Sequence, residues 1–110
     1  MKLVESVTIQ APVERVFAIW SDIERYSEWA DPVILREKRT DGPTRVGTIF
    51  KCVDRWPGRE VTFEMEITEF EENKRLGARW SEPMRGQWTS ELSPAGDGTQ
   101  LDFTMEVHLP

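Results

Sequence analysis

The sequence has only one cysteine and one histidine in 110 residues, and it lacks the spacings that bind metals or hold phosphates. A single cysteine excludes an internal disulfide, and chains of this kind are typical of the cytoplasm, where we expect the protein to act. No cysteines and histidines are arranged at zinc-finger spacing, and no glycine-rich phosphate loop is present. We therefore expect neither a metal nor a cofactor.

The chain also lacks a basic excess and any long apolar run. Its 20 Asp and Glu residues outnumber 14 Lys and Arg residues, which gives a formal net charge of −6. Surfaces that bind phosphates are usually basic, so nucleic acid and anionic membranes are poor candidates as partners. Residues 1–5 do not start a signal peptide, and no apolar stretch is long enough to span a bilayer, so we expect no membrane insertion.

The length and the 38% of hydrophobic residues are typical of one globular domain, which we expect to cover residues 1–110. The segment that organises the chain begins with a strand pattern over residues 2–10. Val16, Phe17 and Trp20 then follow Val13 at the i, i+3, i+4 and i+7 spacing of one helix face.

Two further signals delimit the helical segment that follows the first strand. Pro12 suits a first helical position because its missing N–H has no partner there. Ser21 and Glu24 have the spacing of a capping box, which predicts a second short helix. That helix would carry Ile23, Tyr26 and Trp29, and Asp31 and Pro32 would end it.

The rest of the chain shows strand patterns only, with Pro57 and Gly58 forming a turn between the two best of them. If that turn is a hairpin, Phe50 faces Met65, and a slip by one residue would place apolar side chains against charged ones. Alternation in successive hairpins indicates an antiparallel sheet with one buried and one wet face. The strands are expected at residues 33–39, 46–56, 60–70, 74–81, 85–93 and 101–109.

Several short segments are distinctive in their order and spacing, and they include Ile9 to Pro12, Val16 to Trp20, Tyr26 to Trp29, Gly47 to Phe50 and Gly98 to Leu101. In this order and spacing the sequence resembles the SRPBCC superfamily of START-like and polyketide-cyclase-like helix-grip proteins. The resemblance covers the whole chain and implies an α+β fold, with a curved antiparallel sheet of about seven strands and two short helices between the first two strands. The family also has a long C-terminal helix over a ligand cavity, but the sequence ends where that helix would begin.

The resemblance suggests that inward-facing aromatic and thioether side chains form the wall of a ligand pocket, although the same residues would also suit an ordinary core. On this reading the protein binds a small hydrophobic or aromatic ligand that is lipid-, polyketide- or quinone-like, and most of the binding energy comes from apolar burial. The candidate ligand-binding residues are Trp29 at the mouth and Phe50, Phe63, Met65, Trp80, Trp88, Phe103 and Met105.

An enzyme of the polyketide cyclase, aromatase or dehydratase type is the alternative, and it needs an acid or base that faces the substrate. Asp54 has inward parity and is the weak catalytic candidate, with Glu5 as a second inward carboxylate. His108 has outward parity, and Cys52 is expected to be a buried and inert thiol. A protein-interaction module is a third possibility.

Without a long helix, the inward face of the sheet is expected to be too wide for the short helices to cover. A second copy of the chain, a separate partner or a segment outside these residues would then cover it, and we favour a homodimer that packs through Trp80, Trp88, Phe103 and Met105. The inward set is Val61, Phe63, Met65, Ile67, Leu76, Trp80, Trp88, Leu92, Leu101, Phe103, Met105 and Val107.

Overall fold

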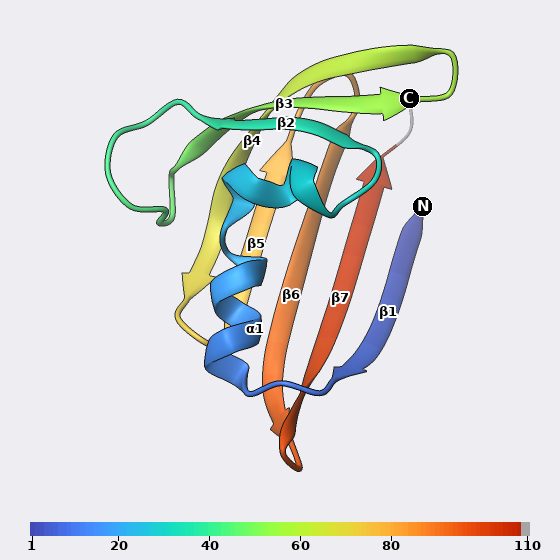
Figure 1. The fold of residues 1–110 in the computed structure, drawn as a ribbon. Coiled ribbons are helices and arrows are strands. Elements are labelled where there is room, and N and C mark those ends of the chain that lie inside the picture. Colours follow the sequence, from blue (N-terminus) through green and yellow to red (C-terminus); the bar gives the residue numbers. More distant parts are fainter. Residues whose placement is uncertain (109–110) are drawn as a thin grey trace.

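The computed structural model describes residues 1–108, which form a seven-stranded antiparallel sheet with two short helices on one face (Figure 1). This architecture confirms the predicted α+β class. Leu109, assigned above to the last strand, lies outside the described residues. The strands are β1 (Lys2–Ile9), β2 (Val33–Lys38), β3 (Ile49–Trp56), β4 (Arg59–Glu71), β5 (Arg75–Trp80), β6 (Arg85–Ala95) and β7 (Gly98–His108).

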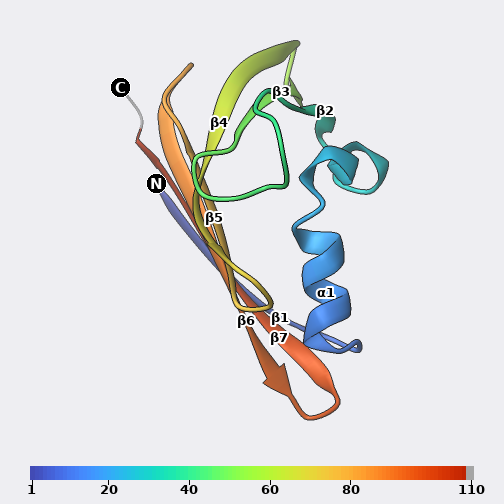
Figure 2. The ribbon, with the colours of Figure 1, turned by 90° about the vertical axis from the view of Figure 1, so that its left-hand side faces the viewer.

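The strand order is β1-β7-β6-β5-β4-β3-β2, so every strand from β2 onward pairs with its neighbour in the chain. The exception is β1, which lies at the opposite edge of the sheet from β2 and pairs with β7. The helices α1 (Val13–Trp20) and η1 (Ile23–Glu28), the latter a 3₁₀ helix, connect these two edges across one face (Figures 1 and 2). That face is the inner face of the sheet.

The first helix packs through the face predicted from its spacing. Val16 and Phe17 are buried, and the Phe17 ring meets the edge of Phe70 with centroids 5.6 Å apart. Pro12 is the N-cap rather than the first helical residue, because its ψ of 157° is extended. The helix thus begins one residue later than expected.

The predicted capping box does not form. The Ser21 hydroxyl donates to the Phe17 carbonyl oxygen at 2.7 Å, so it satisfies the end of α1 instead of the start of η1. Serine side chains often make such bonds to the carbonyl four residues earlier. The second helix nevertheless exists, and it buries Ile23 and Tyr26 as predicted.

The register of the β3–β4 hairpin is the predicted one. Phe50 pairs with Met65, and Lys51 pairs with Glu64. Phe50 and Met65 are 0% and 3% exposed on the inner face, whereas Glu64 is exposed on the outer face. Successive side chains of a strand point to opposite faces of the sheet, so the alternation of apolar and charged residues determines which side chains face inward.

The inner face is better covered than its width suggested. No member of the predicted inward set is exposed, because these side chains pack on one another and on the helices. The sheet also curves towards the helices at its β2–β4 end (Figure 2). Helices α1 and η1 leave part of this face without a second layer, and the residues there are half-buried. These half-buried members are Phe63, Trp80, Phe103, Met105 and Val107.

Candidate functional site

An apolar groove of about 310 Å³ opens between α1 and the β1–β7 edge of the inner face. Several of its residues are large apolar side chains that remain in contact with solvent: Val7 is 49%, Ile19 55% and Trp29 51% exposed. Such a surface favours an apolar occupant, because covering it removes hydrocarbon from water. The groove is lined by Val7, Ile9, Ala11, Arg15, Val16, Ile19, Trp20, Trp29 and Leu101.

Trp20 connects this groove to an aromatic cluster over β6 and β7. Its ring centroid lies 6.3 Å from that of Trp29, 6.0 Å from Trp88 and 6.1 Å from Phe103. Trp88 and Phe103 also stack on each other at 5.9 Å. Edge-to-face and offset contacts of this kind are the favoured geometries of aromatic rings.

A hydrogen-bond relay fixes the orientation of Trp20. The indole N–H donates to the Ser90 hydroxyl at 2.7 Å, and that hydroxyl donates to the Leu76 carbonyl oxygen at 2.8 Å. Ser90 is buried, so the relay satisfies the polar atoms within the apolar layer. It also attaches the C-terminal end of α1 to the middle of the sheet.

A second aromatic pair lies on the inner side of β4 and β5. The rings of Phe63 and Trp80 are 6.1 Å apart, and both side chains are half-buried. The indole of Trp80 lies over Gly86 on the adjacent strand, where any Cβ would clash with the ring. Gly86 thus leaves the space that Trp80 fills.

The polar end of the inner face is a pair between Arg36 and Asp54. The Arg36 Nη1 donates to Asp54 Oδ1 at 2.6 Å, and the two side chains are only 9% and 15% exposed. The Arg36 guanidinium also lies over the Phe63 ring, 5.6 Å from its centroid. Asp54 therefore faces inward as predicted, but its carboxylate is occupied by an arginine.

Arg36 itself is the residue that sequence reasoning missed. The β2–β3 register shifts between Val33 and Leu35, so strict alternation misassigns the faces across the bulge. A buried carboxylate usually requires a cation, and the inward parity of Asp54 was the signal that a partner existed.

The titratable groups near the pair are held neutral by burial. Burial raises the pKa of the Cys52 thiol to about 12, and it raises the pKa of the Tyr26 hydroxyl well above its usual value. Cys52 is free and 0% exposed, as expected for an inert thiol. The Tyr26 hydroxyl donates to the Trp20 carbonyl oxygen. Neither group is therefore a nucleophile at neutral pH.

The predicted wall residues differ in how much surface they offer to a ligand. Phe50, Met65 and Trp88 are buried and belong to the core. Trp29 lines the groove and is exposed, in keeping with its expected position at the mouth of a ligand pocket. The half-buried members, which combine partial exposure with an inward position, are Phe63, Trp80, Phe103 and Met105.

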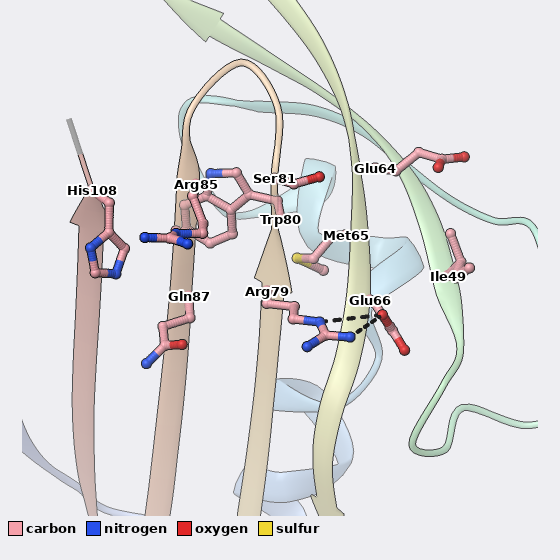
Figure 3. Close-up of a pocket in the computed structure, with 11 residues that line it drawn as sticks. Ile49, Glu64, Met65, Glu66, Arg79, Trp80, Ser81, Arg85, Gln87 and His108 are labelled. Atoms are coloured by element: carbon pink, nitrogen blue, oxygen red, sulfur yellow. Dashed lines mark hydrogen bonds and ion pairs between the residues drawn. The ribbon is translucent and has the colours of Figure 1, made fainter. Parts of the chain in front are cut away.

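A larger hollow of about 580 Å³ lies on the outer face, where side chains from β4, β5, β6 and β7 surround it (Figure 3). Arg79 Nη2 donates to Glu66 Oε1 at 3.0 Å, and Gln87 and His108 are exposed. These charged and polar side chains are paired with one another or exposed to solvent. His108 therefore points outward, as expected. Volume alone therefore does not identify the apolar site, and the chemistry of the lining favours the inner groove.

Within residues 1–108, no three His, Cys, Asp or Glu side chains come together to hold a metal ion. In the same residues, neither helix has the length and hydropathy needed to cross a membrane. The site is thus described by its aromatic wall, its groove and the Arg36–Asp54 pair.

The family model described as "Polyketide cyclase / dehydrase and lipid transport" matches residues 1–110. The chain belongs to this family. Membership agrees with the helix-grip resemblance of the sequence and with the observed order of strands and helices. No curated protein matches the sequence.

Solved structures share the fold of this family member at low sequence identity. A protein from Thermus thermophilus is 24% identical with a TM-score of 0.86, over 100% of this chain and 75% of that one. A START superfamily protein from Mycobacterium smegmatis is 19% identical with a TM-score of 0.83, over 99% and 79%. Ginseng major latex-like protein 151 from Panax ginseng is 9% identical with a TM-score of 0.81, over 98% and 78%.

Proposed function

We propose that the protein binds a small apolar or aromatic molecule against the inner face of its sheet. The observation that carries the proposal is an apolar groove whose Trp20 contacts the half-buried Phe103. The half-buried rings of Phe63 and Trp80 extend the apolar surface of the same inner face. The description of the family, which includes lipid transport, supports the same class of ligand. We propose a cytoplasmic setting, in keeping with the single free thiol.

The proposal is tested with the neutral fluorescent probe N-phenyl-1-naphthylamine. Phe103→Ala removes part of the inner wall and is expected to weaken probe binding about tenfold, which corresponds to about 1.4 kcal/mol. Ile49→Ala is the matched control, because Ile49 is half-buried at the outer hollow, and it should change affinity less than about twofold. Equal effects of the two substitutions, or no probe binding to the folded protein, would contradict the proposal.

A cyclase, aromatase or dehydratase is the second candidate, and the inward carboxylate of Asp54 is the observation that favours it. The ion pair with Arg36 argues for a positioning or binding role, because a general base needs a free oxygen for the substrate proton. We therefore rank catalysis below binding.

Asp54→Asn separates the two functions. For a binding protein we expect the affinity for the naphthylamine probe to stay within about tenfold, because the wall is unchanged. A general base at this position would instead lose about 100-fold or more in turnover. Turnover of any polyketide-like substrate that falls by this factor in Asp54→Asn would reverse the ranking.

We also propose that a second copy of the chain covers the open part of the inner face. Val7 lines the groove together with Trp29 and is 49% exposed, and Leu3, on the same inner side of β1, is 42% exposed. An apolar patch of this kind suits a symmetric dimer, with the half-buried Trp80, Phe103 and Met105 as the proposed contacts. Trp88, which was also expected in the interface, is buried in the core of the protomer and is not available for this contact. A different partner chain is the interaction-module alternative.

A further inference from the structure

Arg36 uses only one end of its guanidinium for the pair with Asp54. Nη1 makes two bonds, to Asp54 Oδ1 at 2.6 Å and to the Leu35 carbonyl oxygen at 3.1 Å. Nη2 reaches Asp54 Oδ2 at 3.4 Å, which is a long contact. The carboxylate thus meets the guanidinium end-on.

The lateral edge of the same guanidinium lacks an acceptor. Nε is buried and has no hydrogen-bond partner within residues 1–108, and the contact with Asp54 is the only one that Nη2 makes there. The Nε hydrogen and one Nη2 hydrogen point the same way, because a planar guanidinium presents its donors in a fixed fork. A buried donor without an acceptor is destabilising, so an oxygen placed at this edge would be bound favourably.

This edge lies where the aromatic wall begins. The Arg36 side chain is only 9% exposed, and its charged carbon is 5.6 Å from the centroid of Phe63. Phe63 in turn contacts Trp80, and both rings are half-buried. A ligand that rests on these two rings therefore has Arg36 at one of its ends.

We propose that the lateral edge of Arg36 binds a neutral carbonyl oxygen of the ligand, as found in a ketone, an ester or an amide. This inference rests on the proposed binding function and names the polar group that the ligand carries. Asp54 already balances the charge of Arg36, so a ligand carboxylate would bring a second negative charge to one guanidinium. A hydrocarbon would leave the fork without an acceptor.

The ligand must displace the atoms that now cover Nε. Phe63 lies beside the guanidinium, with its ring centroid 5.6 Å from the charged carbon, and it is half-buried, so we expect this ring to shift when the carbonyl enters.

The experiment compares three naphthalene probes on the unmodified 110-residue chain by isothermal titration calorimetry. They are 2-acetylnaphthalene, its hydrocarbon isostere 2-isopropylnaphthalene, and 2-naphthoate. We expect the ketone to bind about tenfold or more tightly than the hydrocarbon, and the carboxylate to bind more weakly than the ketone. Equal affinity for ketone and hydrocarbon overturns the inference but leaves the proposed function intact. Absence of binding by all three probes overturns both, and tighter binding of the carboxylate overturns the choice of a neutral oxygen.

Variants assign the preference to Arg36. The double variant Arg36→Met with Asp54→Leu removes both charges together, so that no unpaired ion remains in the interior. We expect its ratio of ketone to hydrocarbon affinity to fall to about one, whereas Arg79→Met, on the outer face, retains the ratio of the unmodified protein. Circular dichroism confirms folding before each titration. If the double variant does not fold, Arg36→Lys replaces it, because lysine keeps the positive charge but lacks the planar fork of donors. We expect Arg36→Lys to lower the ratio of ketone to hydrocarbon affinity. An unchanged ratio in either variant refutes the assignment to Arg36.

Discussion

Two polar residues of the inner face owe their properties to burial. Cys52 has a free thiol that is 0% exposed, and Arg36 has a buried charge that Asp54 balances. Removing one partner of such a pair typically costs about 3–5 kcal/mol, because the other charge remains buried. The pair is therefore expected to constrain this end of the sheet whether or not a ligand is present.

The reactivity of Cys52 tests the burial of the β3–β4 region. With the pKa raised to about 12 from 9.0, the thiolate fraction at pH 8 falls about 1000-fold relative to the unfolded chain. Modification by Ellman's reagent should slow by at least this factor in the folded protein. A native rate close to that of the urea-unfolded chain would contradict the burial of this thiol.

The same shift links stability to alkaline pH. The folded state favours the neutral thiol, so this contribution is fully present below the unfolded pKa of 9.0 and is lost as the pH rises towards about 12. Stability should therefore decline through this interval. Cys52→Ala should show a smaller decline between these pH values in urea denaturation.

At the scale of elements, the attachment of α1 to the sheet depends on the relay from Trp20 through Ser90 to Leu76. Ser90→Ala leaves the indole N–H and the Leu76 carbonyl oxygen without that partner, which should lower the free energy of unfolding by about 1–3 kcal/mol. Ser93→Ala is the control, because Ser93 is exposed on the same strand and its loss should change stability by less than about 0.5 kcal/mol. Similar urea midpoints for the two variants would show that the relay does not stabilise the fold.

The elements differ in how far the sequence determines them. The β3–β4 register was predictable because the turn at Pro57 and Gly58 and the alternation of charge agree on a single pairing. The partner of Asp54 was not predictable, since the bulge in β2 places Arg36 inward against simple alternation. The division of the wall into core and half-buried residues depends on tertiary packing, which a period-two pattern does not contain.

At the scale of the whole molecule, the open inner face should determine the oligomeric state. We expect light scattering on the 110-residue chain to give the mass of a dimer at micromolar concentrations, because apolar patches of this kind are rarely left exposed. A monomer at every concentration would contradict the proposed dimer, and a mass that grows only with an added protein would favour the partner alternative.

Two exposed valines of β1 provide a matched test of that interface. Val7 faces the inner side and is 49% exposed, whereas Val4 faces the outer side and is 65% exposed. Val7→Lys should weaken the dimer about tenfold or more by placing a charge in the contact, and Val4→Lys should leave it unchanged. Equal dissociation constants for the two variants would exclude the inner face as the interface.

The position of β1 also has a consequence for folding during synthesis. Lys2 pairs with Glu106, and the Met1 amine donates to the Val107 carbonyl oxygen at 2.9 Å, so the first strand needs the last one. During synthesis, β2 to β6 can pair in turn as they leave the ribosome, while β1 waits for β7. The growing chain therefore contains β1 as an unpaired strand until β7 has been made, and this strand is the segment that a chaperone would bind.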